Sequence, residues 1–269
     1  MSRLLSERLF PETTDALAGA GAAAGWVCLA AVLRGLAMRG GKAADPIVAR
    51  LVHALAGVGA VTEGVGAAAR CFSSGVASAD SEAKVALGPL AHAVAKPLWQ
   101  QRFFAGAAKL LTGAGAPAGL PLLLALAHLL RGAPPNVVAS DRQRTVPWAV
   151  QCLVAVAAGQ ARFDPDLVEA LLQVPTQALV AEAGRATVEG QLHVLLPALL
   201  ALTAHRGAAL VREAALHCLL LLAAELPYPA LHPYAKGVAA AAIAALDDPK
   251  RSVRLQAGRC RAAWGAPSA

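Results

Sequence analysis

The sequence is poor in aromatic and charged residues. Aromatic residues make up 4% and charged residues 15% of the 269 positions, whereas about 25% charged residues is usual in soluble domains. Alternating runs of Val, Ile and Thr, which are typical of half-buried strands, are also absent. The excess within the 57% hydrophobic content is mostly Ala and Leu, which form helices readily because they lose little side-chain entropy there. The composition therefore predicts an all-α protein and excludes sheet-based folds.

Cysteine pairs at metal-ligand spacing are missing as well. The five cysteines, Cys28, Cys71, Cys152, Cys218 and Cys260, lie far apart in the sequence, and no histidine stands at ligand spacing from any of them. A CxxC zinc or iron–sulfur signature is thereby excluded. The odd number of cysteines argues against a secreted disulfide framework, so we expect a reduced cytosolic or nuclear setting.

Catalytic motifs are absent too. The sequence contains no GxSxG elbow, no Walker loop, no HExxH and no carboxylate pair backed by a base. Gly19 to Gly25 is rich in glycine, but no strand precedes it, so we interpret it as part of an Ala-rich helix. The seven histidines are dispersed. We therefore expect no enzyme activity, no cofactor and no metal site.

The positive mean hydropathy raises the question of a membrane span, which needs about 20 predominantly apolar residues. Residues 16–33 are uncharged but consist mostly of Ala and Gly, and residues 145–161 are interrupted by Pro147. We interpret such segments as buried helices of a soluble stack. The first 15 residues contain acidic residues and no clean apolar block, so they do not resemble a secretory signal.

The net charge of +7 permits contact with nucleic acid or with an acidic protein surface. The basic residues are scattered singly, and no Lys/Arg run is interleaved with aromatic residues as a nucleic-acid groove requires. We therefore expect no direct nucleic-acid binding. The alternative is that most of these charges are simply solvated helix ends and loops.

An internal repeat stands near the C-terminal end. The segment from Val211 to Cys218 reappears as Val253 to Cys260, at an offset of 42 residues, within the roughly 40–47 residue period of HEAT and armadillo units. Valine, alanine and cysteine are spaced four and three apart in both copies, so they share one helix face. We therefore predict that Cys218 and Cys260 are buried in the cores of their repeats.

The arginine of each copy points off that face. In HEAT units such an arginine commonly ties an acidic turn to its neighbour. Asp247 and Asp248 stand close enough to Arg254 for this role, whereas the turn at residues 205–208 before Arg212 contains no acid. Two alternatives stay open: the cysteines of the repeat could be reactive thiols, and Arg254 could be an exposed contact for a partner protein.

Asp-Pro pairs predict where helices begin. Aspartate can cap the free N–H groups of the first turn, and proline supplies the required φ. The pairs are Asp45-Pro46, Asp164-Pro165 and Asp248-Pro249. Together with other turn signals they divide the chain into apolar segments of about 12–20 residues, the length of solenoid helices.

We therefore predict a HEAT-type α-solenoid, an armadillo-like superhelix of five or six helical hairpins. Residues 1–10 are expected to be a flexible N-terminus, residues 11–264 one continuous solenoid and residues 265–269 a flexible tail. The segment at 60–80 has the least distinct pattern. The clearest hairpins are expected at 97–132, 143–183, 190–226 and 231–264.

Several motifs, in order, resemble one family. They are Leu226 to Tyr234, Ala245 to Arg254 with the closing Trp264, Gln101 to Phe104 after Trp99, and Leu192 to Val194 followed by Val211-Arg212 and Ala214 to Leu216. The segment around Trp26 fits more loosely. The family is the large HEAT-repeat adaptor of the cytosolic iron–sulfur protein assembly targeting complex, first named for methyl methanesulfonate sensitivity and nucleotide excision repair.

The resemblance implies a non-catalytic scaffold in the cytoplasm and nucleus. Such adaptors help deliver iron–sulfur clusters to apo-proteins, including DNA repair and replication enzymes, and their C-terminal repeats dock the other subunits of the targeting complex. Members are several times longer, so we expect this chain to be a fragment, an incomplete gene model or a short form. The alternative is a generic HEAT scaffold in transport or phosphatase regulation.

Five residues are candidates for partner contact because they combine basic or aromatic character with a place at repeat ends: Arg102, Phe103, Lys250, Arg251 and Arg254. The alternative is structural. In that interpretation Phe103 and Phe104 belong to the core, and Arg254 is an intramolecular clamp on its own turn.

Overall fold

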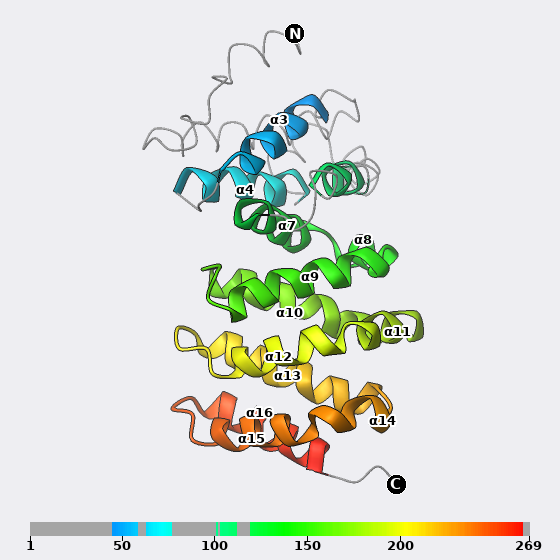
Figure 1. The fold of residues 1–269 in the computed structure, drawn as a ribbon, viewed down its shortest axis with the longest axis vertical. Coiled ribbons are helices and arrows are strands. Elements are labelled where there is room, and N and C mark those ends of the chain that lie inside the picture. Colours follow the sequence, from blue (N-terminus) through cyan, green and yellow to red (C-terminus); the bar gives the residue numbers. More distant parts are fainter. Residues whose placement is uncertain (1–44, 59–62, 77–100, 102, 112–118, 266–269) are drawn as a thin grey trace, which may run out of the picture. The chain divides into compact units, whose positions relative to one another are not determined.

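The computed structural model describes residues 45–58, 63–76, 101, 103–111 and 119–265. Every regular element within these ranges is a helix, as the composition predicts (Figure 1). The chain divides into two compact units, residues 1–138 and 139–269, which are described separately. Of the expected flexible ends, residues 1–10 and 266–269 lie outside the described residues, whereas Gly265, the first residue of the expected tail, is the last residue of a helix. One continuous solenoid over 11–264 stays a prediction.

The N-terminal unit contains α3 (Asp45–Ala56), α4 (Glu63–Val76), a helical stretch at 103–111 and α7 (Leu120–Gly132). Helix α4 packs along α7, and α3 contacts both. Leu55, Phe72 and Leu129 are almost fully buried in this unit. The short α8 (Pro135–Ser140) spans the boundary between the units.

The C-terminal unit is a succession of helices joined by short turns. They are α9 (Arg142–Ala157), α10 (Pro165–Leu179), α11 (Glu182–Gly190), α12 (Leu192–Thr203), α13 (Ala209–Glu225), α14 (Tyr228–Leu231), the 3-10 turn η3 (His232–Tyr234), α15 (Ala235–Ala245) and α16 (Arg251–Gly265). The pairs α9/α10, α12/α13 and α15/α16 lie almost wholly within the ranges predicted for the last three hairpins.

These three hairpins stack in two layers (Figure 1). The first helices contact one another in the order α9, α12, α15, and the second helices in the order α10, α13, α16. Within each hairpin the two helices also pack together. Each helix away from the ends of the stack therefore has neighbours on three sides, which accounts for the high apolar content of the chain.

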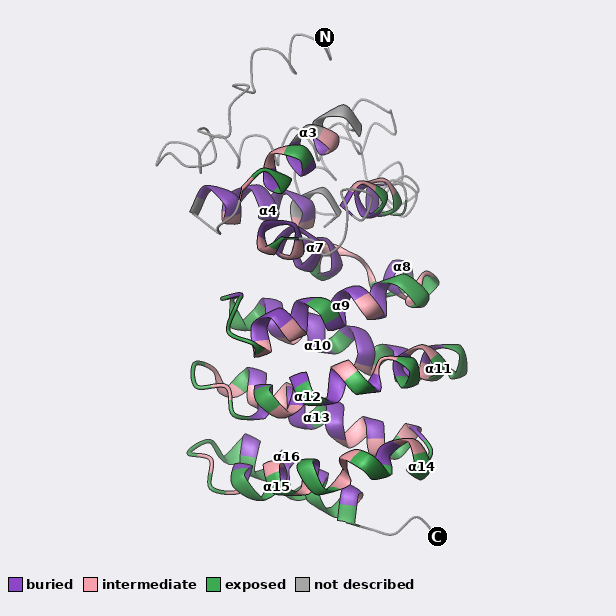
Figure 2. Ribbon diagram, in the orientation of Figure 1, coloured by how far each residue is buried: buried purple, intermediate pink, exposed green. Residues whose placement is uncertain are grey.

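Helix α13 shows how this arrangement uses the sequence. It contacts α10, α12 and α16, and Val211, Ala215, Cys218 and Leu222 are 0% exposed. Buried positions recur along the inner faces of the stack (Figure 2). Cys260 of α16 is also 0% exposed, so the predicted burial of both repeat cysteines is confirmed.

One predicted helix start is found: α10 begins at Pro165, although the side chain of Asp164 makes no capping hydrogen bond. Helix α16 begins at Arg251, after the predicted start at Pro249, and the residues before Asp45 lie outside the described residues. Before α16, the Oδ1 atom of Asp248 accepts a hydrogen bond from the backbone N–H of Lys250, at 2.8 Å. A side-chain acceptor at this place satisfies one of the donors that a helix start leaves free.

The most apolar helices are covered by their neighbours. In α12, Leu195, Leu196 and Leu199 are each 0% exposed. Among the described helices, none alone has the length and apolar character to cross a membrane; α11 and α12 meet those criteria only as a pair, and they are bent by 82° where they join.

Candidate protein-binding surface

Helix α16 is amphipathic, and its two faces have different surroundings. The buried face carries Val253, Gln256, Ala257, Cys260 and Trp264, and it packs against α13 and α15. Gln256 Nε2 lies 3.1 Å from Nδ1 of His217 in α13. The opposite face is exposed and consists of Arg251, Ser252, Arg254, Leu255, Gly258, Arg259, Arg261 and Ala262.

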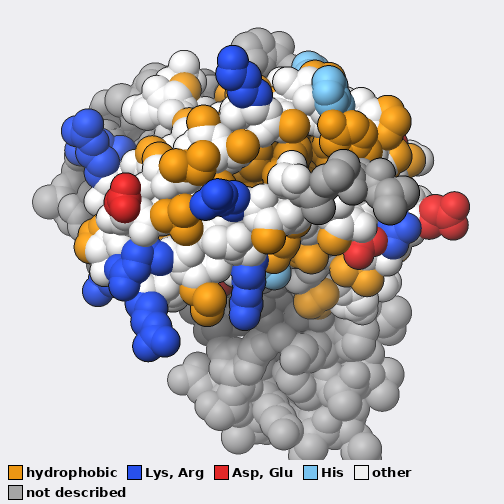
Figure 3. Space-filling model, turned by 90° about the horizontal axis from the view of Figure 1, so that it is seen from below, with side chains coloured by type: hydrophobic (Ala, Val, Ile, Leu, Met, Phe, Trp, Pro, Cys, Tyr) orange, Lys and Arg blue, Asp and Glu red, His pale blue; other side chains and the backbone are white. Residues whose placement is uncertain are grey.

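This exposed face is strongly basic. Helix α16 contains four arginines and no acidic residue, and Lys250 stands directly before it, also exposed. We call Lys250, Arg251, Arg254, Arg259 and Arg261 the basic end. A view onto the C-terminal end of the chain shows blue Lys and Arg side chains among apolar ones, with few acidic side chains (Figure 3). Such a surface favours acidic partners.

Three of the five residues predicted for partner contact lie in the basic end: Lys250, Arg251 and Arg254. Arg102 lies outside the described residues. Phe103 and Phe104 are 7% and 3% exposed, so they belong to the core of the N-terminal unit, as in the structural alternative. Sequence reasoning missed Arg259 and Arg261, although a helical projection of residues 251–265 places both off the buried face.

Arg212 has an acidic partner that its own turn lacks. Its Nε donates to Oδ2 of Asp248 at 2.6 Å, and its Nη2 donates to Oδ1 at 3.0 Å. Its Nη1 donates to the carbonyl oxygen of His205 at 2.9 Å. The aspartate therefore comes from the next hairpin, 36 residues later. We expected the carboxylate of Asp248 to hydrogen-bond with Arg254 of its own repeat, and this is wrong. The carboxylate accepts its side-chain hydrogen bonds from Arg212 of the preceding hairpin.

This ion pair is largely shielded from water. The side chains of Arg212 and Asp248 are 13% and 8% exposed. The hydrogen bonds from Arg212 hold the pKa of Asp248 below its usual range, and the bond from the Lys250 N–H acts in the same direction. The parallel, two-point geometry is the strong form of an arginine–carboxylate contact. Asp248 therefore joins two successive hairpins.

The hydrogen bonds of Arg254 within the described part of the chain go to the backbone of its own turn, and its charge also lowers the pKa of the Asp248 carboxyl. Its Nη1 donates to the carbonyl oxygens of Asp248 at 2.7 Å and Pro249 at 3.0 Å. It is therefore an intramolecular clamp, as in the structural alternative, and it is exposed at the same time. The two roles are compatible because one nitrogen of the guanidinium makes both bonds.

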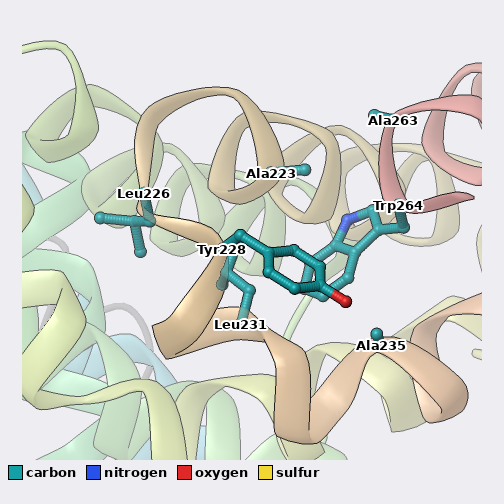
Figure 4. Close-up of a pocket in the computed structure, with 7 residues that line it drawn as sticks. All are labelled: Ala223, Leu226, Tyr228, Leu231, Ala235, Ala263 and Trp264. Atoms are coloured by element: carbon teal, nitrogen blue, oxygen red, sulfur yellow. The ribbon is translucent and has the colours of Figure 1, made fainter. Parts of the chain in front are cut away.

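A small hollow lies behind the last hairpin. It has a volume of about 40 Å³ and is lined by Ala223, Leu226, Tyr228, Leu231, Ala235, Ala263 and Trp264. These side chains come from α13 to α16 (Figure 4). Sites for small molecules usually measure about 300–1,000 Å³, so this hollow is too small to be one.

The titratable side chains in the described ranges do not form a metal site. No group of three or more His, Cys, Asp and Glu residues is placed to hold a metal ion there. The four described cysteines, Cys71, Cys152, Cys218 and Cys260, are buried. Burial raises the pKa of each to about 12, so these thiols are protonated and poorly nucleophilic at neutral pH.

The stacked hairpins and the basic end define the class as an all-helical protein with an exposed basic surface on its last described helix. Residues 3–223 match the family model MMS19_C, described as RNAPII transcription regulator C-terminal. The chain belongs to this family, which confirms the resemblance to the adaptor family.

Two relatives carry the same name, MMS19 nucleotide excision repair protein homolog. The one from Arabidopsis thaliana is 30% identical over 246 residues, which is 88% of this chain and 21% of the relative. The one from Dictyostelium discoideum is 28% identical over 142 residues, 53% of this chain and 12% of the relative. The chain thus spans about a fifth of the Arabidopsis relative's length and less of the other.

Proposed function

We propose that this chain is the docking part of a HEAT-repeat adaptor that serves cytosolic iron–sulfur protein assembly. In this role it holds the other subunits of the targeting complex and, through them or directly, apo iron–sulfur client proteins that include DNA repair and replication enzymes. It acts in the cytoplasm and nucleus as a scaffold without catalytic chemistry of its own.

Membership of the MMS19 C-terminal family carries the proposal more than any other observation. The last described helix, which contains four arginines and no acidic residue, adds an exposed surface for a partner. Repeat stacks bind other polypeptides through extended surfaces without needing a pocket. The two-layer order of the hairpins and their 42-residue echo support the HEAT assignment.

Co-purification tests the scaffold role. The tagged full chain is expressed with the targeting-complex subunits, and their recovery is measured by quantitative mass spectrometry. We expect recovery with the unmodified chain. Failure of the unmodified chain to recover any of these subunits would contradict the proposal.

Two charge reversals then test the predicted site. Lys250→Glu combined with Arg251→Glu is expected to lower recovery, because both side chains are exposed at the basic end. The matched control is Arg162→Glu combined with Arg206→Glu, since both arginines are exposed on loops of earlier hairpins. Thermal unfolding of both variants shows whether they remain folded. Unchanged recovery with the first variant would remove Lys250 and Arg251 from the site.

The second candidate is a generic HEAT scaffold in transport or phosphatase regulation. The repeat architecture supports it equally, but family membership favours the first proposal. The two differ in what co-purifies: a phosphatase or transport factor in place of the targeting-complex subunits would favour the second.

A further inference from the structure

The guanidinium group of Arg212 connects the last two described hairpins, because it hydrogen-bonds to a turn of each. Through Nη1, Arg212 holds the carbonyl oxygen of His205 in the turn that precedes its own helix. Through Nε and Nη2 it holds the carboxylate of Asp248 in the turn of the following hairpin. The arginine of one hairpin thus binds the aspartate of the next.

Arg254 is the counterpart of Arg212 in the last described hairpin, 42 residues later. It makes the first half of the same contact, because its Nη1 donates to the carbonyl oxygens of Asp248 and Pro249 before its helix. Within the described residues, Nε and Nη2 of Arg254 have no acceptor. In Arg212 the corresponding Nε and Nη2 atoms donate to the carboxylate of Asp248.

The surroundings of Arg254 suit an acidic polypeptide. On α16 it is neighboured by Arg251 and by the exposed Leu255, which is 56% exposed. Positive charge beside a large exposed apolar side chain fits a partner that brings both a carboxylate and apolar surface.

We propose that Nε and Nη2 of Arg254 bind an aspartate or glutamate in a turn of a partner protein that packs against the exposed face of α16, as Asp248 binds Arg212. The inference rests on the proposed function only in that the chain holds other proteins. A protein carboxylate is favoured over nucleic acid for two reasons. The same chain shows the carboxylate geometry one hairpin earlier, and no exposed aromatic residue is interleaved with the arginines of α16.

Site-specific photocrosslinking from Gly258 tests the proposal. Gly258 is exposed, one turn after Arg254, and a Cβ added there meets nothing within 4 Å. The full chain carrying benzoylphenylalanine at position 258 is irradiated in cells and purified under denaturing conditions. Mass spectrometry identifies the crosslinked peptide. We expect a polypeptide segment that contains Asp or Glu in a turn.

Variants of Arg254 decide whether this carboxylate binds where proposed. Arg254→Gln and Arg254→Lys are each expected to lower the crosslinking yield about tenfold or more, since a charge-assisted two-point contact is lost in both. Arg162→Gln is the matched control and is expected to leave the yield unchanged. Arg254→Glu combined with reversal of the identified partner carboxylate to Arg is expected to restore crosslinking. Thermal unfolding verifies that each variant is folded.

Several outcomes would overturn the proposal. They are a yield that does not depend on Arg254, a crosslinked segment without a carboxylate, recovery of nucleic acid or of a second copy of this chain, and the absence of any crosslink. The proposed function is judged separately. If the crosslinked acidic turn belongs to a protein unrelated to iron–sulfur assembly, the proposed function fails and the proposed Arg254 contact stands. If the targeting-complex subunits co-purify with the chain whether or not Arg254 is substituted, only the proposed Arg254 contact fails.

Discussion

The indole Nε1 of Trp264 donates a 2.8 Å hydrogen bond to the carbonyl oxygen of Leu219, 45 residues earlier in the chain. The bond fastens the end of α16 to the middle of α13. Because Trp264 is 9% exposed, its donor has little access to water and depends on this partner.

Trp264→Phe is therefore expected to lower the free energy of unfolding by about 1 kcal/mol or somewhat more, since it removes the hydrogen bond and part of the buried ring. Urea unfolding followed by circular dichroism measures the change. Tyr228→Phe is the control: Tyr228 is 44% exposed and its ring contact with His232 does not require the hydroxyl, so a change within about 0.5 kcal/mol is expected. Equal effects of the two substitutions would contradict the role of the indole donor.

Asp248→Asn is expected to destabilise the chain by about 1–3 kcal/mol, because it leaves the partly buried guanidinium of Arg212 without its counter-charge. The neighbouring Asp247 is exposed, and its side chain has no hydrogen bond or ion pair to another described residue. Asp247→Asn is therefore expected to change stability by less than about 0.5 kcal/mol. Urea titrations at pH 7 compare the two. A similar loss for both would show that the Arg212 contact contributes little.

The same pair predicts a dependence on pH. The pKa of Asp248 is held below its ordinary value of 3.8 in the folded chain, so its contribution is fully present above that value. It is lost as the pH falls through the lower folded pKa, because the unfolded chain binds the proton first. Between about pH 5 and pH 2, the unmodified chain should lose more stability than Asp248→Asn does. Parallel curves for the two proteins would contradict this.

The buried Gly184 and the exposed Gly258 are expected to respond oppositely to substitution by alanine. A Cβ on Gly184 would stand 2.0 Å from the carbonyl oxygen of Ala178, so Gly184→Ala forces the α10–α11 corner apart and should cost about 3 kcal/mol. Gly258 has open space around it, and Gly258→Ala should stabilise α16 by about 0.5–1 kcal/mol. Urea unfolding provides both values. Tolerance of alanine at position 184 would show that the corner is less tightly packed than described.

Thiol reactivity tests the core of the stack. In a Cys28→Ser chain, the remaining four thiols are those with a pKa raised to about 12 by burial. We expect them to react slowly with a colorimetric disulfide reagent at pH 8 in the native chain, and all four to react promptly in denaturant. Rapid labelling of Cys218 or Cys260 under native conditions would contradict their place between α13 and α16.

The sequence predicts local features well because they depend on near neighbours. The 42-residue echo places Cys218 and Cys260 in repeat cores, and both are fully buried. The Asp-Pro pair at residue 164 marks the start of α10. The first depends on helix periodicity and the second on the fixed φ of Pro165 in the first turn, and both act over one or two turns.

The partner of Arg212 could not be predicted in the same way. A search in its own turn finds no acid, while the structure supplies Asp248 from the next hairpin. Likewise, Phe103 has the character of a contact residue in the sequence but is buried. Both outcomes depend on how helices distant in sequence come together.

The sequence by itself determined that the described residues are helical, that Cys218 and Cys260 turn inward, and where α10 begins, because propensity, periodicity and the fixed φ of proline are properties of short segments. Only the tertiary structure decided which charges meet. The stacking of one hairpin on another brings Asp248 to Arg212, and it leaves Nε and Nη2 of Arg254 without an acceptor among the described residues. Stacking is set by the packing of whole helix faces, so no spacing within one repeat reveals it.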